Sequence, residues 1–177
     1  MKKIILTTLV CALIGSAGMF SSCGKSNEDD DKQTWVYDHT KDGLVGEWVS
    51  EGANVAPLFI QYNLADSIYA YFKDNGTYYV ETFKQKAKTT FEGSYEQTKS
   101  TIDNIWTIRL NQTTPGVAIS EGIFEVTKTS NTYFMKYEII QIEPPAGTAP
   151  TPEGGFGSSM GGASGEGWVQ KYVRISK

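Results

Sequence analysis

Residues 67–83 read SIYAYFKDNGTYYVETF, two runs rich in aromatic and β-branched residues on either side of the turn sequence KDNG at 73–76. Asn and Gly accept the positive φ that a tight hairpin turn needs. Successive side chains of a strand point to opposite faces, so Ile68 and Phe72 share one face and Tyr78 continues it across the turn. This segment therefore predicts an antiparallel hairpin with one apolar face.

The same alternation extends outward from this hairpin, and no helical period accompanies it. Segment 143–167 is rich in Pro and Gly and is expected to be a long loop between two strands. Sequential strands with mostly short connections favour an all-β, eight-stranded antiparallel up-and-down barrel, because closure removes the exposed edges. A β-sandwich of the same strands is the alternative. The predicted strands are 45–50, 67–72, 77–83, 90–97, 102–111, 119–127, 132–142 and 168–175.

Three short sequence motifs resemble those of a known family of β-barrel proteins. Gly46-Glu47-Trp48 resembles the G-x-W of lipocalins, and the stretch FKDNGTY at 72–78 resembles a hairpin of lipocalin-like (calycin-type) lipoproteins from Bacteroidetes. The segments 93–95 and 105–108 are similar to the next hairpin of those proteins. The resemblance implies a barrel domain over 44–177, in which Trp48 plugs the closed end and Arg174 from the last strand packs across it.

The N-terminus has the features of a secretory signal. Two lysines precede a short apolar run over 4–13, and small residues follow. The run is too short for a transmembrane helix, which needs about 20 apolar residues. Ser21-Ser22-Cys23 resembles a bacterial lipobox, which implies a lipoprotein signal peptide over 1–22 and lipidation of Cys23 with acyl chains such as palmitate.

A polar stretch over 23–43 follows and is expected to be a lipidated acidic tether. Its run of acidic residues at 28–31 resembles the surface-export signal of Bacteroidetes lipoproteins. We therefore expect an outer-membrane lipoprotein, held through its lipid anchor on the cell surface. The alternative is the periplasmic face, with the acidic stretch as a solvated spacer.

The inward-facing residues of the predicted barrel are largely aromatic. Such a lining suits a small apolar ligand with a polar group, although aromatic side chains at strand spacing also form solid cores. With a filled barrel, the alternative function is a module that binds a protein or glycan of the cell envelope. Its candidate partner patch is Tyr69, Tyr71 and Tyr79, which lie on the outward parity. The candidate ligand-binding residues are Tyr78, Tyr95, Trp106, Tyr133 and Tyr137.

Composition argues against several other functions. The net charge is −4, and loss of Lys2 and Lys3 with the signal peptide makes it −6, which disfavours nucleic-acid binding. The single histidine and the loss of Cys11 leave no residues for a zinc site or thiol catalysis. Residues 157–161 match G-x-S-x-G, but they lie in a glycine-rich loop and lack the strand-to-helix turn that the motif needs. We expect a protein with no enzymatic activity, no cofactor and no metal.

The lipoprotein interpretation makes a direct prediction. Cys23→Ala removes the sulfur that would carry the lipid, and two or more acyl chains anchor a protein firmly where one is marginal. The variant should move from the membrane fraction to the soluble fraction on cell fractionation. Retention in the membrane fraction would contradict the lipoprotein assignment.

Overall fold

The computed structural model describes residues 36–175. They form eight strands, one short α-helix and three 3-10 turns. The helix is α1 (Pro57–Gln61), and the 3-10 turns are η1 (Gly52–Asn54), η2 (Ser159–Gly162) and η3 (Gly165–Trp168). The strands are β1 (Gly46–Glu51), β2 (Ser67–Phe72), β3 (Thr77–Lys84), β4 (Ala87–Lys99), β5 (Trp106–Thr114), β6 (Ala118–Thr129), β7 (Thr132–Glu143) and β8 (Gln170–Arg174).

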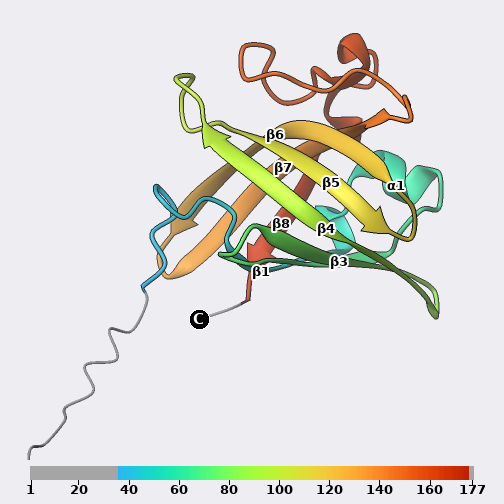
Figure 1. Ribbon diagram of the computed structural model, residues 1–177, viewed down its shortest axis with the longest axis horizontal. Coiled ribbons are helices and arrows are strands. Elements are labelled where there is room, and N and C mark those ends of the chain that lie inside the picture. The colour runs from blue at the N-terminus through green and yellow to red at the C-terminus, as the bar shows by residue number, and fades with distance from the viewer. Residues whose placement is uncertain (1–35, 176–177) are drawn as a thin grey trace, which may run out of the picture. The chain divides into compact units, whose positions relative to one another are not determined.

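Each strand pairs antiparallel with the next, and β8 returns to pair with β1, so the sheet closes into an up-and-down barrel (Figure 1). The closing contact aligns Trp48 with Arg174 and Val49 with Val173. The predicted fold class is confirmed, and a single closed ring of strands excludes the β-sandwich. The predicted hairpin register is confirmed too, because Phe72 lies opposite Tyr78.

Two connections differ from the sequence-based expectation. Strand β5 begins at Trp106 and not near residue 102, because residues 100–105 form a turn in which Asp103 takes a positive φ. The long connection before β2 contains α1, whose first residue, Pro57, has the fixed φ that suits a helix start. A five-residue helix is too short to show a helical period in the sequence.

One end of the barrel is filled by aromatic side chains. Trp48 is fully buried, and its Nε1 donates a hydrogen bond of 2.7 Å to the carbonyl oxygen of Leu44. The ring of Tyr37 packs edge-on against that of Tyr133, with 4.8 Å between centroids, and lies 3.8 Å from the guanidinium carbon of Arg174. Trp48 and Arg174 therefore lie opposite each other on neighbouring strands at this closed end.

The folded domain extends further toward the N-terminus than the expected boundary at residue 44. Tyr37 is buried in the core cluster, and the segment 38–43 forms hydrogen-bonded turns beside it. The boundary differs because Tyr37, in the stretch expected to be tether, buries its aromatic ring in the core and so joins this stretch to the folded domain. The expected signal peptide 1–22, the lipidation site Cys23 and the tether as far as residue 35 lie outside the described residues.

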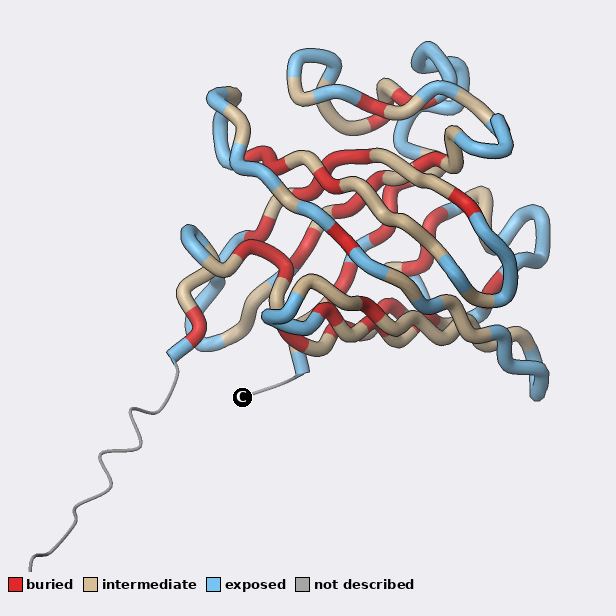
Figure 2. Tube along the Cα trace, in the orientation of Figure 1, coloured by how far each residue is buried: buried red, intermediate tan, exposed pale blue. Residues whose placement is uncertain are grey.

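The connection between β7 and β8 folds back across the outer face of β6 and β7 (Figures 1 and 2). Ile123 and Ile140 alternate with inward-facing residues and therefore point to the outer face of the barrel. Both are nevertheless buried. Glu138, on the same outer face, is fully buried and accepts backbone hydrogen bonds from Gly157 (2.7 Å) and Ser159 (3.2 Å). A buried carboxylate with charge-assisted hydrogen bonds thus ties this loop to the barrel wall.

The closed end can be tested by truncating its central ring. We expect Trp48→Ala to lower the free energy of unfolding by about 3–5 kcal/mol, because it leaves a large cavity and removes a buried hydrogen bond. Denaturant titration of the purified protein measures this. Trp168→Ala is the control, since Trp168 is only half-buried and should cost less. A loss below about 1 kcal/mol for Trp48→Ala would contradict a structural role.

Candidate functional site

The barrel encloses a cavity of about 260 Å³ at the end where α1 lies. Phe59 of α1 lines its mouth, and Phe72 and Tyr78, on either side of the β2–β3 turn, also line the cavity. The wall is mostly apolar because these positions have the inward parity of their strands. The apolar wall residues include Ile68, Ala70, Val80, Phe91, Leu110 and Ile139.

Three tyrosines supply phenol groups to this cavity: Tyr78, Tyr137 and Tyr172. Tyr137 and Tyr172 pack edge to face, with 5.9 Å between ring centroids. Burial raises the pKa of Tyr78 to about 12 and the pKa of Tyr172 further. Burial also raises the pKa of Tyr137 well above its usual value, and the neighbouring phenols of Tyr172 and Tyr78 add to that effect. Tyr137 is therefore near both other phenols, and all three hydroxyls stay protonated at neutral pH.

Gln170 is another polar residue of the cavity lining, on β8 directly opposite Tyr137. The remaining polar lining residues are Thr82, Gln112, Ser120 and Gln141. Gln170 is only 4% exposed. Its Oε1 accepts a hydrogen bond from the backbone N–H of Ala56, the residue that precedes α1. Its Nε2 is buried and has no hydrogen-bond partner among the described residues. The Gln170 side-chain amide thus fixes the start of α1 at the mouth of the cavity through its oxygen. Its NH₂ group remains as an unused hydrogen-bond donor.

The structure brings together only part of the predicted ligand-binding set. Tyr78 and Tyr137 line the cavity, whereas Tyr95, Trp106 and Tyr133 do not. Tyr95, Trp106 and Tyr133 have the expected inward parity but lie nearer the closed end. There, contacts with neighbouring residues hold their side chains. The hydroxyl of Tyr95 donates a hydrogen bond of 2.7 Å to the carbonyl oxygen of Lys73.

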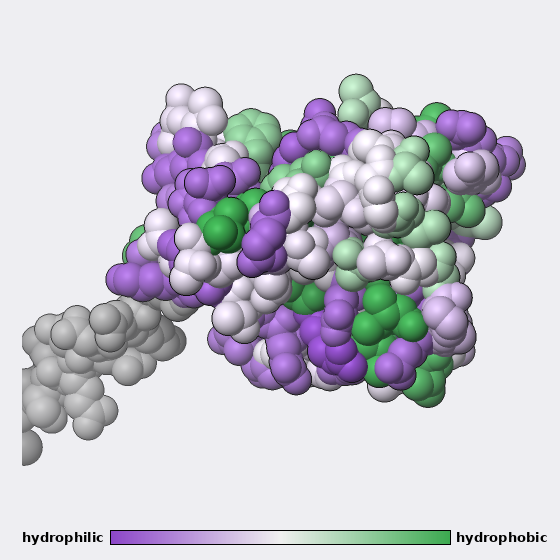
Figure 3. Space-filling view, turned by 90° about the horizontal axis from the view of Figure 1, so that it is seen from above, coloured by the Kyte–Doolittle hydropathy of each residue, from purple (hydrophilic) through white to green (hydrophobic). Residues whose placement is uncertain are grey.

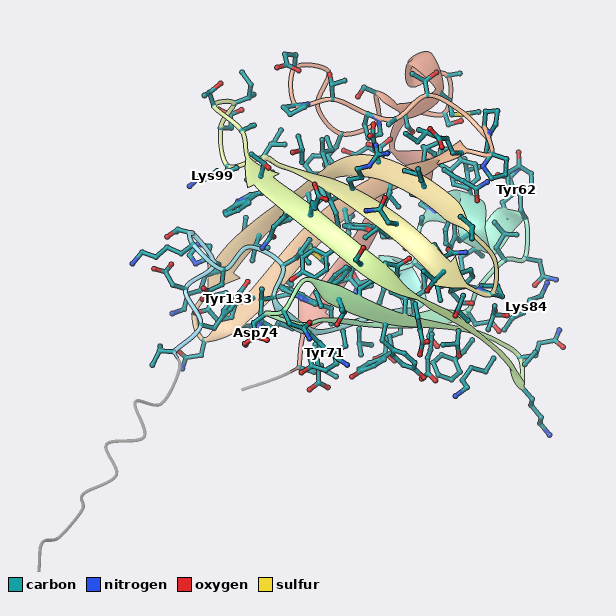
Figure 4. All side chains as sticks on the ribbon, viewed as in Figure 1. Tyr62, Tyr71, Asp74, Lys84, Lys99 and Tyr133 are labelled. Carbon is teal, nitrogen blue, oxygen red and sulfur yellow. The ribbon has the colours of Figure 1, made fainter. Side chains whose placement is uncertain are left out.

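Trp106 and Tyr133 show the same effect of position along the strand. Trp106 stacks on Phe124 with 5.7 Å between ring centroids, and Tyr133 packs on Tyr37. Figure 4 shows Tyr133 at the end of the barrel away from Tyr62 and α1. Both rings therefore build the closed end.

Sequence reasoning missed Gln170, Tyr172 and Phe59 as cavity residues. The eighth strand alternates apolar residues on both faces, so its parity was ambiguous, and Gln170 is a polar residue on the inner face. Phe59 reaches the cavity from α1, which has no strand pattern. The pairing of β8 with β7 resolves the ambiguity by placing Tyr172 opposite the buried Met135.

The candidate partner patch lies on the outside of β2 and β3. Tyr69, Tyr71 and Tyr79 are half-buried there, beside a surface groove of about 710 Å³. The hydroxyl of Tyr69 donates a hydrogen bond of 2.9 Å to Glu47, and that of Tyr79 donates to Glu81. The structure thus places the three rings side by side on one outer surface, and Figure 4 shows Tyr71 on this side of the barrel. In the view from above, apolar residues form separate clusters among polar ones (Figure 3).

The G-x-S-x-G match lies in the loop over β7. Ser158 donates its hydroxyl hydrogen bond to the carbonyl oxygen of Gly155 (2.6 Å), and Ser159 is fully buried beneath the loop. His39 lies near Tyr133 at the closed end, with 5.6 Å between ring centroids. Over residues 36–175, no three His, Cys, Asp or Glu side chains group into a metal site. No helix in this same part of the chain has both the length and the apolar character to span a membrane.

No protein-family model matches the chain, and comparisons with curated proteins and with solved structures also find no match. The site is therefore interpreted from its own geometry.

The buried phenols predict a loss of stability at alkaline pH. Tyrosines of the unfolded chain ionise near pH 10, whereas burial raises the pKa of both Tyr78 and Tyr95 to about 12. The unfolded chain then releases protons first, so the free energy of unfolding should fall as the pH rises from about 10 to about 12.

Urea unfolding at stepped pH, together with the phenolate absorbance of the folded protein, measures this effect. Tyr78→Phe removes one such group and should make the decline shallower. Stability that stays constant across this interval would contradict the burial of these hydroxyls.

Proposed function

We propose that this protein is a membrane-anchored, lipocalin-like lipoprotein that binds a small apolar ligand inside its barrel. The observation that carries the proposal is the cavity of about 260 Å³ with an apolar wall and unused hydrogen-bonding groups. Ligand sites combine these two features, since apolar contact supplies affinity and a few placed polar groups fix orientation. The proposed lipid anchor at Cys23 would hold this binding domain at the outer membrane, on the cell surface or on the periplasmic face.

The size of the cavity limits the ligand. An engineered apolar cavity of about 150 Å³ takes up benzene, and pockets for drug-sized ligands begin near 300 Å³. The barrel cavity lies between these values. It therefore suits one substituted ring, a pair of fused rings or a short branched chain, and not a long-chain lipid.

The surroundings of the mouth fit an apolar ligand. Ile60 and Leu64, in and after α1, are each about half exposed, at 50% and 49%. Phe59 lines the cavity from α1, and the rings of Phe59 and Tyr62 pack against Trp168 of η3. Apolar surface at the entrance lets an apolar molecule leave water before it reaches the cavity.

The tyrosine patch on the outer face supports a second candidate function, recognition of an envelope protein or glycan. Tyr69, Tyr71 and Tyr79 expose parts of their rings beside carboxylates and a groove. Tyrosines are enriched in interfaces because they combine an apolar ring with a hydrogen-bonding end. The cavity favours small-ligand binding over this candidate, since the interaction module assumed a filled barrel.

Native mass spectrometry of the full chain, purified gently from cells, tests the choice. We expect a co-purifying small apolar mass on the wild-type protein. Val80→Phe places a ring in the cavity and should abolish that mass, whereas Tyr79→Phe, on the outward side of the same strand, should keep it. Wild-type protein free of ligand would favour the outer patch, to be followed by a pull-down from the envelope.

A further inference from the structure

Eight polar side chains line the cavity: Tyr78, Thr82, Gln112, Ser120, Tyr137, Gln141, Gln170 and Tyr172. The Nε2 atoms of Gln112 and Gln141 already donate to the carbonyl oxygens of Gly116 and Pro144, so the free N–H and phenol donors come from the other residues. Gln170 Nε2 can only donate a hydrogen bond, and the protonated phenols of Tyr78, Tyr137 and Tyr172 each carry an O–H donor. Among the described residues, the hydroxyls of these three phenols make no hydrogen bond to another side chain or to the backbone. Together they place several unused donors around one apolar space.

The orientation of Gln170 follows from its hydrogen bond to the backbone. An N–H must find an acceptor, so the donor Ala56 N requires the amide oxygen of Gln170 on its side. The NH₂ group then lies on the other side of the same planar amide, buried and without a partner among the described residues. Buried donors are normally satisfied, so an orphan donor in a cavity lining points to an acceptor that the chain itself does not supply.

The absence of charged side chains in the cavity lining indicates which kind of hydrogen-bond acceptor the ligand carries. Among the described residues, no Lys, Arg, His, Asp or Glu lines this cavity. A buried carboxylate is expensive to desolvate unless a paired charge or fixed backbone donors compensate it, as the N–H groups of Gly157 and Ser159 do for Glu138. The raised pKa values of Tyr78 and Tyr137 have the same origin, since burial disfavours a negative charge there.

From this geometry we infer that the cavity selects a neutral ligand with a ring-sized apolar body and a carbonyl-type oxygen. That oxygen accepts hydrogen bonds from Gln170 Nε2 and from the phenols of Tyr137 and Tyr78, while the apolar body fills the space between Ala70, Val80 and Leu110. This inference rests on the proposed ligand-binding function and adds the chemical class that the site accepts.

The test compares three probes of one shape on the full-length protein by isothermal titration calorimetry. Acetylnaphthalene carries a neutral carbonyl, isopropenylnaphthalene replaces that oxygen by carbon, and naphthoate carries a charge. Wild-type protein should bind the ketone about tenfold more tightly than the hydrocarbon, which corresponds to about 1.4 kcal/mol. The carboxylate should bind more weakly than the ketone.

Tyr→Phe variants separate the hydrogen bonds from the fold, because they keep the ring and remove only the hydroxyl. The double variant Tyr78→Phe/Tyr137→Phe should lose most of the preference for the ketone and keep its affinity for the hydrocarbon. Tyr95→Phe is the matched control. Its hydroxyl already donates to the Lys73 carbonyl outside the cavity, so the preference should stay.

Each contrary result has a distinct meaning. Equal affinity of wild-type protein for ketone and hydrocarbon would overturn the inference and leave ligand binding in the barrel intact. Tightest binding of naphthoate would overturn the choice of a neutral ligand. Failure of all three probes to bind, with wild-type and Val80→Phe proteins behaving alike, would count against the proposed function itself.

Discussion

Closure of the sheet between β8 and β1 is the constraint on which the rest of the structure depends. The ladder is short, with Trp48 opposite Arg174 and Val49 opposite Val173, yet it converts a meander with two open edges into a barrel. An eight-stranded barrel is just wide enough to be filled by side chains or to hold one small ligand. Whether the interior of this barrel is hollow therefore depends on the size of the inward-facing side chains at each position along the barrel axis.

The two ends of this barrel differ in how they use that space. At the closed end, Trp48, Trp106 and Phe124 supply large rings, and Tyr37 covers Arg174 from the N-terminal segment. Toward α1 the inward positions include small or branched residues such as Ala70 and Val80, which leave volume unfilled. The same inward parity thus builds a packed core at one end and a cavity at the other.

The sequence predicted the strands well because their alternation is a local signal. Tyr78 and Tyr137 could be assigned to the interior for the same reason, and both line the cavity. Depth along the barrel is not a local property, so Tyr95 and Tyr133 could not be separated from them by parity.

The remaining features depend on contacts that are distant in the sequence. Gln170 meets Ala56 across the closing strands, and Glu138 is buried only because the loop over β7 folds back on it. From the sequence, a glutamate on the outward side of a strand is predicted to be solvent-exposed, because the folded-back loop is not visible there. The unpaired Nε2 of Gln170 and the burial of Glu138 could therefore not be predicted from any one segment of the sequence.

The central claim is that the barrel is hollow and apolar near α1, and a crystal structure under xenon pressure tests it most directly. Xenon enters dry apolar cavities, so the account predicts xenon density bounded by Ala70, Val80 and Leu110. A barrel with no xenon site, in which Tyr78 and Leu110 close the space by direct contact, would contradict it.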